Sequence, residues 1–197
     1  VPSRQPQPVK AWPPTMKDNA RTNIKYLDVE HGLISTNLIA LHEDSEGRIW
    51  IASQTKGVSM YDGETFRHYS ENEGLCNNYV NTIIEDKHGN LLFGTLDGIS
   101  IYDGCSFKHI RLKEDTLATA VWSILEDSYG NVWFGTNQGL YVYNGVSIRH
   151  LTEKEGLINN HIWSVIEDNE GLIWLGTMGG VSIYNGLSFS NLTEKEG

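Results

Sequence analysis

The stretch that decides the fold occupies residues 121–143 and reads VWSILEDSYGNVWFGTNQGLYVY. It recurs four times at a spacing of 41 or 42 residues, which the turn aspartates mark: Asp44, Asp86, Asp127 and Asp168. Each aspartate follows a glutamate and precedes a glycine by three residues, and each copy continues through an apolar run to Gly-Thr or, in the first copy, Ala-Ser. A period near 40 residues made of short β-like runs is typical of a propeller, with one blade per copy.

One copy resolves into four strands. Residues 121–126 form a β-rich run that ends at Asp127, whose side chain can accept hydrogen bonds from the backbone of its own turn. Two further apolar runs follow, and an Asn-Gly pair at 144–145 then predicts a hairpin to a fourth strand at 147–151. No stretch has the 3.6-residue period of a long helix. We therefore predict an all-β fold, a β-propeller of four four-stranded blades.

The ends of the chain predict an arm and an incomplete ring. All five prolines lie within the first 14 residues, so residues 1–22 are expected to form an extended arm or linker. We expect the propeller segment over 23–197, with a surplus strand at 23–29 and blades at about 32–73, 74–114, 115–155 and 156–197. The last residues, 192–197, repeat 151–156, after which another blade begins. We expect part of a larger ring, closed by further blades or by self-association.

Composition argues against several classes of function. The net charge of −10 disfavours nucleic-acid binding, which needs a basic stripe. No apolar run is long enough to span a membrane, and no signal peptide is recognisable. Cys76 and Cys105 fall in loops at opposite ends of the expected strands, roughly 17–20 Å apart. Because a disulfide needs Cα atoms within about 7 Å, we predict two separate thiols.

Two repeated patterns resemble metal ligands, but neither predicts a site. The paired carboxylates could bind calcium, yet turn capping by the aspartate explains them without a metal. His68, His109 and His150 recur on the fourth strands, which fan apart in a ring, whereas zinc ligands converge within about 2 Å of one ion. We therefore predict no metal and no cofactor. His161 lies in a connector instead and stays a candidate metal ligand.

The variable residues predict where a site would lie. In a propeller the connectors into each first strand and the loops between second and third strands share one face, here called the connector face; the Asp-x-x-Gly and Asp/Asn-Gly turns share the opposite turn face. Tryptophans and amides on the connector face suit sugar rings, which stack on aromatic groups and bond to amides. Filling of space between blades is the alternative role for the tryptophans. The candidate ligand-binding residues are Trp122, Trp163, Asn137, Gln138, Asn160 and His161.

The repeat resembles the two-component regulator propeller family. The stretch 121–143 follows its pattern, V-x-x-I-x-E-D-x-x-G-N-x-W-x-G-T-x-x-G-L-x-x-Y, and the connectors at 73–78 and 155–160 share EGLxNN. Leu92 replaces the tryptophan in the second copy, and the third connector lacks Gly-Leu. The resemblance implies the periplasmic or extracellular sensor of a hybrid histidine kinase, without catalysis, tuned to an oligosaccharide or another small ligand. The alternatives are a propeller lyase of the streptogramin type and a protein-interaction scaffold.

Overall fold

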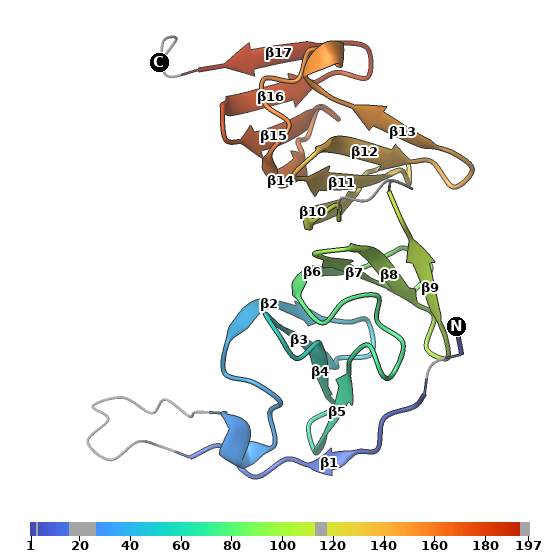
Figure 1. Cartoon of the computed structure of the whole chain (residues 1–197), viewed down its shortest axis with the longest axis vertical. Coiled ribbons are helices and arrows are strands. Elements are labelled where there is room, and N and C mark those ends of the chain that lie inside the picture. The colour runs from blue at the N-terminus through green and yellow to red at the C-terminus, as the bar shows by residue number, and fades with distance from the viewer. Residues whose placement is uncertain (3, 16–26, 113–117, 194–197) are drawn as a thin grey trace.

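The computed structural model describes residues 1–2, 4–15, 27–112 and 118–193, and in them the chain is an all-β propeller segment (Figure 1). Each predicted blade is an antiparallel sheet whose strands follow in chain order from the inside outward. The strands of the four blades are β2 (Leu38–Glu43), β3 (Ile49–Ser53), β4 (Val58–Tyr61) and β5 (Thr65–Tyr69); β6 (Val80–Glu85), β7 (Leu91–Thr95), β8 (Gly98–Tyr102) and β9 (Phe107–Ile110); β10 (Val121–Glu126), β11 (Val132–Thr136), β12 (Gly139–Tyr143) and β13 (Ile148–Leu151); and β14 (Ile162–Glu167), β15 (Ile173–Thr177), β16 (Gly180–Tyr184) and β17 (Phe189–Leu192).

Every innermost strand carries a bulge at the same position. The pairing of β10 with β11 shifts between Val121 and Ser123, so Trp122 has no partner in register. The same shift occurs in the other three blades, where the corresponding residues are Ile39, Asn81 and Trp163. A bulge frees one side chain from the alternating pattern and turns it outward. The repeat therefore supplies one such side chain per blade, close to the axis.

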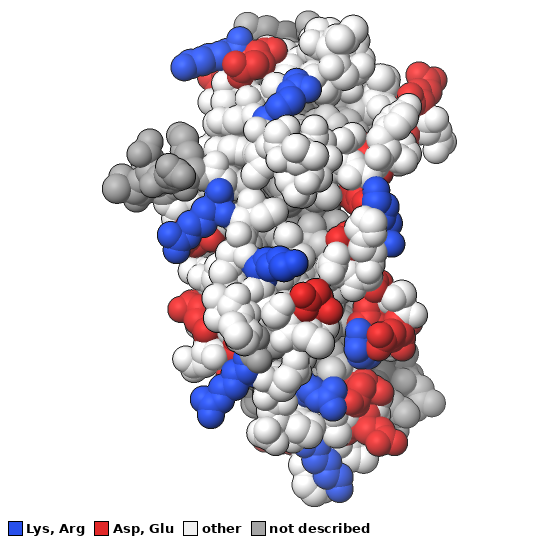
Figure 2. All heavy atoms as spheres, turned by 90° about the vertical axis from the view of Figure 1, so that its right-hand side faces the viewer, with Lys and Arg blue, Asp and Glu red and all other residues white. Residues whose placement is uncertain are grey.

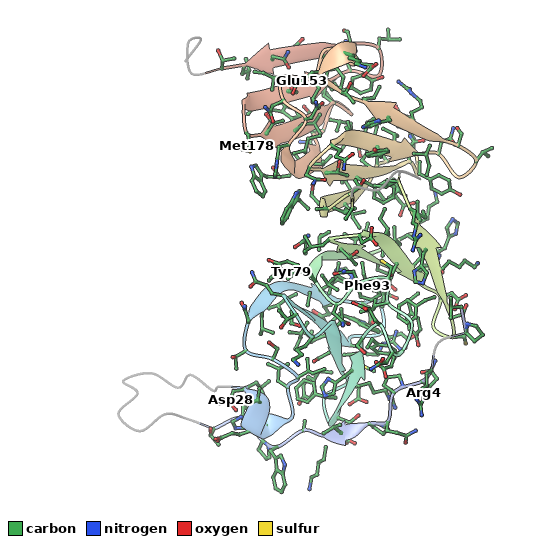
Figure 3. The ribbon with its side chains drawn as sticks, viewed as in Figure 1. Arg4, Asp28, Tyr79, Phe93, Glu153 and Met178 are labelled. Carbon is green, nitrogen blue, oxygen red and sulfur yellow. The ribbon has the colours of Figure 1, made fainter. Side chains whose placement is uncertain are left out.

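The core lies between blades. Trp50 and Met60 of the first blade pack against Ile83 and Phe93 of the second, and equivalent residues fill the next two interfaces. Figure 3 shows Phe93 in the first of these interfaces. Trp50 and Trp133 at the second-strand position are thus packing residues, and Leu92 fills the same place in the second blade.

The blades form an open arc. Consecutive innermost strands contact one another, β2 with β6, β6 with β10 and β10 with β14. In Figure 1 these strands line the concave side, the outer strands fan away from it, and the arc stays open between β2 and β14. The structure therefore has the form of a partial propeller, as expected. Among the described residues, no helix has the length and apolar character that a membrane span requires.

The N-terminal arm docks on the outside of two blades. Its strand β1 (Val9–Lys10) pairs with β5, which gives the first sheet five strands. The amino group of Val1 donates to the carbonyl of Phe107 at 2.7 Å. The arm thus follows the outer edge from the second blade to the first (Figure 1).

The surplus strand expected at 23–29 is not seen where the structure describes it. Residues 23–26 lie outside the described part, Leu27 and Asp28 are irregular, and Val29 begins the 3₁₀ helix η1 (Val29–His31). The Asp28 side chain caps η1 by accepting from the Glu30 amide at 2.9 Å. The same reciprocal capping box, with Thr152 and Glu155, starts η2 (Glu153–Glu155) before the fourth blade. Residues 28–33 are therefore an ordinary connector and not part of a strand.

Candidate ligand-binding face

The two kinds of loop that were predicted to share a face do meet. In each blade the residue after the second strand donates its amide to the carbonyl of the residue just before the first strand. The four pairs are Gln54 with Asn37, Leu96 with Tyr79, Asn137 with Ala120, and Met178 with His161. Figure 3 labels two members of this rim, Tyr79 and Met178, on the concave side of the arc.

Three of the six candidate residues form one aromatic cluster. The ring centroids of Trp122 and Trp163 are 5.1 Å apart, those of His161 and Trp163 4.3 Å, and those of Trp122 and His161 6.0 Å. The bulge positions bring the two tryptophans together from neighbouring blades, and the connector adds the histidine. Trp163 is 48% exposed, so one ring of the cluster is open to solvent. Such a ring is available for stacking.

Two ring nitrogens of the cluster are buried without a hydrogen-bond partner among the described residues. They are Nε1 of Trp122 and Nε2 of His161. A buried polar group without a partner costs about 1–3 kcal/mol. The cluster therefore contains two hydrogen-bonding groups that its own side chains do not satisfy.

The other three candidates lie beside a separate hollow. Asn137, Gln138 and Asn160 line a depression of about 640 Å³, together with His150 and the connector around η2. Its remaining walls are polar and charged, with Glu153, Lys154 and Glu155 among them. The connector face thus offers an aromatic surface and a polar depression, each built by the third and fourth blades.

Two of the candidate amides have structural partners. The Asn160 Oδ1 atom accepts from the Glu153 amide at 3.0 Å, while the Asn160 amide donates to the Glu153 side chain at 3.1 Å. Asn78 and Glu71 make the same reciprocal pair in the second connector. The Asn137 side chain accepts from the Ala120 amide at 3.0 Å. These asparagines hold the connectors in place. Any contact that they make with a ligand would come in addition to this structural role.

The repeated histidines serve their own blades. His150 stacks on Tyr141 with centroids 4.0 Å apart and bonds to the Gln138 carbonyl at 2.7 Å. His68 lies 3.0 Å from the Ser59 hydroxyl, and burial lowers the pKa of its ring. In the described part of the chain no three histidine, cysteine or acidic side chains are grouped as metal ligands would be. Cys76 and Cys105 are free thiols.

The turn face is built from repeated hydrogen bonds that the sequence alone did not reveal. Asp127 Oδ2 accepts from the indole of Trp133 at 2.8 Å, and Asp44 and Asp168 bind Trp50 and Trp174 in the same way. The fixed spacing of six residues between each aspartate and tryptophan was the available signal. A hollow of about 560 Å³ lies on this face between the second and third blades, next to the ion pair of Lys87 with Glu126 at 3.4 Å.

The described residues on one side of the molecule form no basic stripe. Figure 2 shows lysine and arginine side chains interspersed with acidic and uncharged residues over this side. The described residues of this side therefore offer a polyanion no continuous basic surface, and the net charge of the chain is −10.

The family follows from the repeat. The model of the two-component regulator propeller matches residues 32–55, 74–97, 117–138 and 156–179, one match for each blade. These four blades are two-component regulator propeller repeats. Each match runs from a connector through the first two strands, so it contains the connector, the bulge position and the Asp-x-x-Gly turn. No curated protein is significantly similar to the chain.

Solved structures similar to the chain include extracellular domains of two-component systems. The chain is similar to the extracellular domain of a B. thetaiotaomicron protein assigned to the hybrid two-component systems, with 27% identity, a TM-score of 0.73, and coverage of 81% of this chain and 23% of that one. A second such domain from B. thetaiotaomicron has 21% identity and a TM-score of 0.69, with coverage of 90% and 23%. The chain thus spans about a quarter of the length of these domains.

Enzymes share the fold as well. A streptogramin B lyase is 15% identical with a TM-score of 0.66, and the match covers 82% of this chain and 56% of the lyase. At that identity the likeness shows the fold alone. Chemistry must be judged from the residues of this chain.

Proposed function

We propose that the chain is a ligand-sensing segment of an extracytoplasmic two-component sensor, and that it binds a carbohydrate on its connector face without catalysing a reaction. The observation that carries the proposal is the aromatic cluster of Trp122, His161 and Trp163. The similarity to extracellular domains of two-component systems supports the sensor role and a periplasmic or extracellular location.

The connector face suits a sugar because it combines an exposed aromatic ring with a polar hollow. The open ring of Trp163 provides a flat apolar surface for the C–H face of a pyranose. The polar hollow around Gln138 supplies groups that bond to hydroxyls. An oligosaccharide long enough to extend from the cluster to the hollow would use both.

The position of His161 argues against the lyase alternative. A general base must lie within hydrogen-bond reach of the proton that it removes. The Nε2 atom of His161 is buried and the ring lies against two tryptophans, so this nitrogen does not reach a substrate proton.

A glycan array followed by calorimetric titration of the sugars retained tests the proposal. We expect Trp163→Ala to weaken binding about tenfold, since one aromatic contact contributes on the order of 1 kcal/mol. Tyr129→Ala is the control on the opposite face, because Tyr129 is an aromatic residue of the turn face that is 83% exposed. Retention of no glycan, or an equal loss with both variants, would contradict carbohydrate binding at this face.

The same titrations separate the alternatives. Turnover of a streptogramin-type lactone in the presence of divalent metal, abolished by His161→Ala, would establish the lyase instead. Loss of binding only with variants of the turn-face hollow, such as Lys87→Ala, would move the site to the other end of the strands.

A further inference from the structure

Two hairpin turns of the turn face carry the pair Asn-Gly. They are Asn144-Gly145, between β12 and β13, and Asn185-Gly186, between β16 and β17. The first two blades have Asp-Gly at the same turns, with Asp62 and Asp103. Both asparagines are exposed to solvent. Asn144 belongs to an internal blade, so both neighbouring blades are present around it.

The side-chain carbonyl of Asn144 lies among hydrogen-bond donors. Its Oδ1 atom accepts from the amide of Val146 at 3.0 Å and from the amide of Ser147 at 2.8 Å. The Ser147 hydroxyl adds a third, longer contact at 3.3 Å. The two amides lie at the distances at which backbone N–H groups stabilise negative charge that develops on a carbonyl oxygen. The Cγ atom of Asn144 is therefore prepared for attack by a nucleophile.

The backbone nitrogen of Gly145 can supply that nucleophile. Among the described residues its N–H group has no acceptor, and the glycine is exposed. A Cβ added at Gly145 would meet nothing within 4 Å, so the space beside this peptide is open to solvent. The Asn144 side chain is folded forward over the same peptide, because its Oδ1 atom reaches the amides two and three residues ahead.

An asparagine of the fourth connector shows the opposite arrangement. The Oδ1 atom of Asn159 also accepts from an amide two residues ahead, that of His161 at 2.9 Å. The amide that follows Asn159 is that of Asn160, however, and it donates to the Glu153 carboxylate at 3.1 Å. A hydrogen bond of this kind holds the proton and the orientation of the nitrogen. The second connector has the same arrangement after Asn77.

We propose that Asn144 and Asn185 are sites of deamidation that the hairpin turn itself promotes. Hydroxide takes the proton of the Gly145 amide, whose nitrogen attacks Cγ of Asn144, so a C–N bond forms and Oδ1 becomes negative. Collapse of this intermediate breaks the bond from Cγ to Nδ2, and the leaving nitrogen takes a proton from water to depart as ammonia. Water then opens the five-membered imide at either of its two carbonyls. The products are aspartate and isoaspartate.

The turn accommodates the aspartate product. At the same turn of the second blade, Asp103 accepts from the amides of Ser106 and Cys105 and from the Ser106 hydroxyl. These bonds lower the pKa of Asp103, so its carboxyl stays ionised, and a carboxylate is a poor electrophile. The reaction therefore stops at aspartate and adds one negative charge to each turn. Because the turn face lies opposite the connector face, this inference does not depend on the proposed ligand.

The two sites should react at different rates. The Oδ1 atom of Asn185 accepts from the amides of Leu187 at 3.0 Å and Ser188 at 2.9 Å. Among the described residues no hydroxyl donates to it, whereas Asn144 has the additional bond from Ser147. We expect Asn144 to deamidate several-fold faster than Asn185 in the same molecule.

Peptide mapping by mass spectrometry, during incubation of the intact chain in warm neutral buffer, tests the proposal. It follows the mass change from amide to acid at each asparagine. We expect conversion at Asn144 and Asn185 while Asn159 stays unchanged. We also expect both sites to react several-fold faster in the folded chain than in the same chain unfolded in guanidinium chloride, because the donors to Oδ1 are in place only in the folded turn.

Ser147→Ala is the variant that isolates the hydroxyl. It should slow Asn144 to the rate of Asn185 and leave Asn185 as it was, so the second turn is a matched control within one chain. Ser147 is exposed, and thermal unfolding checks that the fold is kept. A slower reaction in the folded chain than in the unfolded one overturns the proposal. Conversion of Asn159 at an equal rate, or an unchanged Asn144 rate in Ser147→Ala, also contradicts it.

Discussion

The two ends of the strands differ in what the repeats share. On the turn face each aspartate binds its own turn, and each glutamate after the first blade binds the turn of its neighbour. On the connector face the bulge positions hold isoleucine, asparagine and two tryptophans. One end of the blade is therefore fixed by the hydrogen bonds that hold blades together, and the other is free to vary. A face that varies while the fold stays constant is where binding specificity can develop.

The largest expected effect is on the turn face. Asp127 accepts from two backbone amides, the Asn131 side chain and the Trp133 indole, and it is buried. We expect Asp127→Ala to lower the free energy of unfolding by about 3 kcal/mol, because the buried indole N–H loses its partner along with the turn bonds. Denaturant unfolding measures this effect.

Asp86→Ala is the matched control for Asp127→Ala. Leu92 takes the place of the tryptophan beside Asp86, so no indole is orphaned there. We expect a loss of about 1–2 kcal/mol. Equal losses at the two positions would show that the indole bond adds nothing.

A somewhat smaller effect concerns the glycine of the second strand. A Cβ on Gly135 would lie 2.5 Å from the Ser123 hydroxyl and 2.9 Å from a methyl of Ile162 in the next blade. We expect Gly135→Ala to cost about 1–3 kcal/mol by overpacking. Among the described residues, a Cβ on Gly176 would meet only Ser164 closely.

The double variant Ser164→Ala/Gly176→Ala should therefore be nearly neutral in thermal denaturation. The first blade already carries that combination, Ala40 opposite Ala52. A large loss in this double variant would mean that the glycine is needed for its backbone and not for space.

On the connector face the expected effects on stability are smaller. They distinguish Asn160, which holds a connector in place, from Trp163, whose exposed ring is available for stacking. Asn160→Ala removes the reciprocal bonds to Glu153 and should cost about 1 kcal/mol. Trp163→Ala removes a half-exposed ring and should cost less than Asn160→Ala, while affecting ligand binding more. Thermal shift and calorimetry on the same preparations compare the two variants, and the reverse order would contradict the division of roles.

The smallest effect is a change in acid sensitivity. The Trp174 indole bond, with amides of the turn, lowers the pKa of Asp168. Burial works to raise the pKa of Asp44, but bonds from Trp50 and Arg48 and the Arg48 charge outweigh it and lower it. A carboxyl with a depressed folded-state pKa adds stability above its unfolded pKa of about 3.9, and this stability is lost as pH falls through the folded-state value.

Trp174→Phe should bring the pKa of Asp168 closer to its ordinary value. The melting temperature should then fall less steeply below pH 4 than in the unchanged chain. An unchanged slope from pH 7 to pH 3 would show that the indole bond does not favour the ionised form.

The fold could be predicted from the sequence because each blade repeats the same local signals. The turn aspartate, the Asn-Gly hairpin and alternating apolar residues act within one copy, and four copies agree. The strand β1 could not be predicted, because a two-residue strand among prolines forms only by pairing with the edge of β5. Of the strand expected at 23–29, residues 23–26 lie outside the described part, and Asp28 caps the 3₁₀ helix that begins at Val29.

The candidate site was predictable in part. The common register of Trp122 and Trp163 placed both rings at adjacent bulges, and the structure brings His161 against them. The clamping role of Asn160 could have been recognised, because Glu71 and Glu153 each precede an asparagine by seven residues. The bond from Ser45 to Glu85 could not, because it joins residues 40 apart whose separation depends on how blades stack.

The bulge in each innermost strand has a consequence for how such propellers diversify. Each repeat contributes one residue near the axis that takes no part in the regular pairing of the ladder. These residues stand at positions 39, 81, 122 and 163. Duplicating a repeat therefore adds one such position, and a substitution there leaves the pairing of the ladder unchanged. A family that copies blades can explore new specificities in small independent steps, each compatible with the same scaffold.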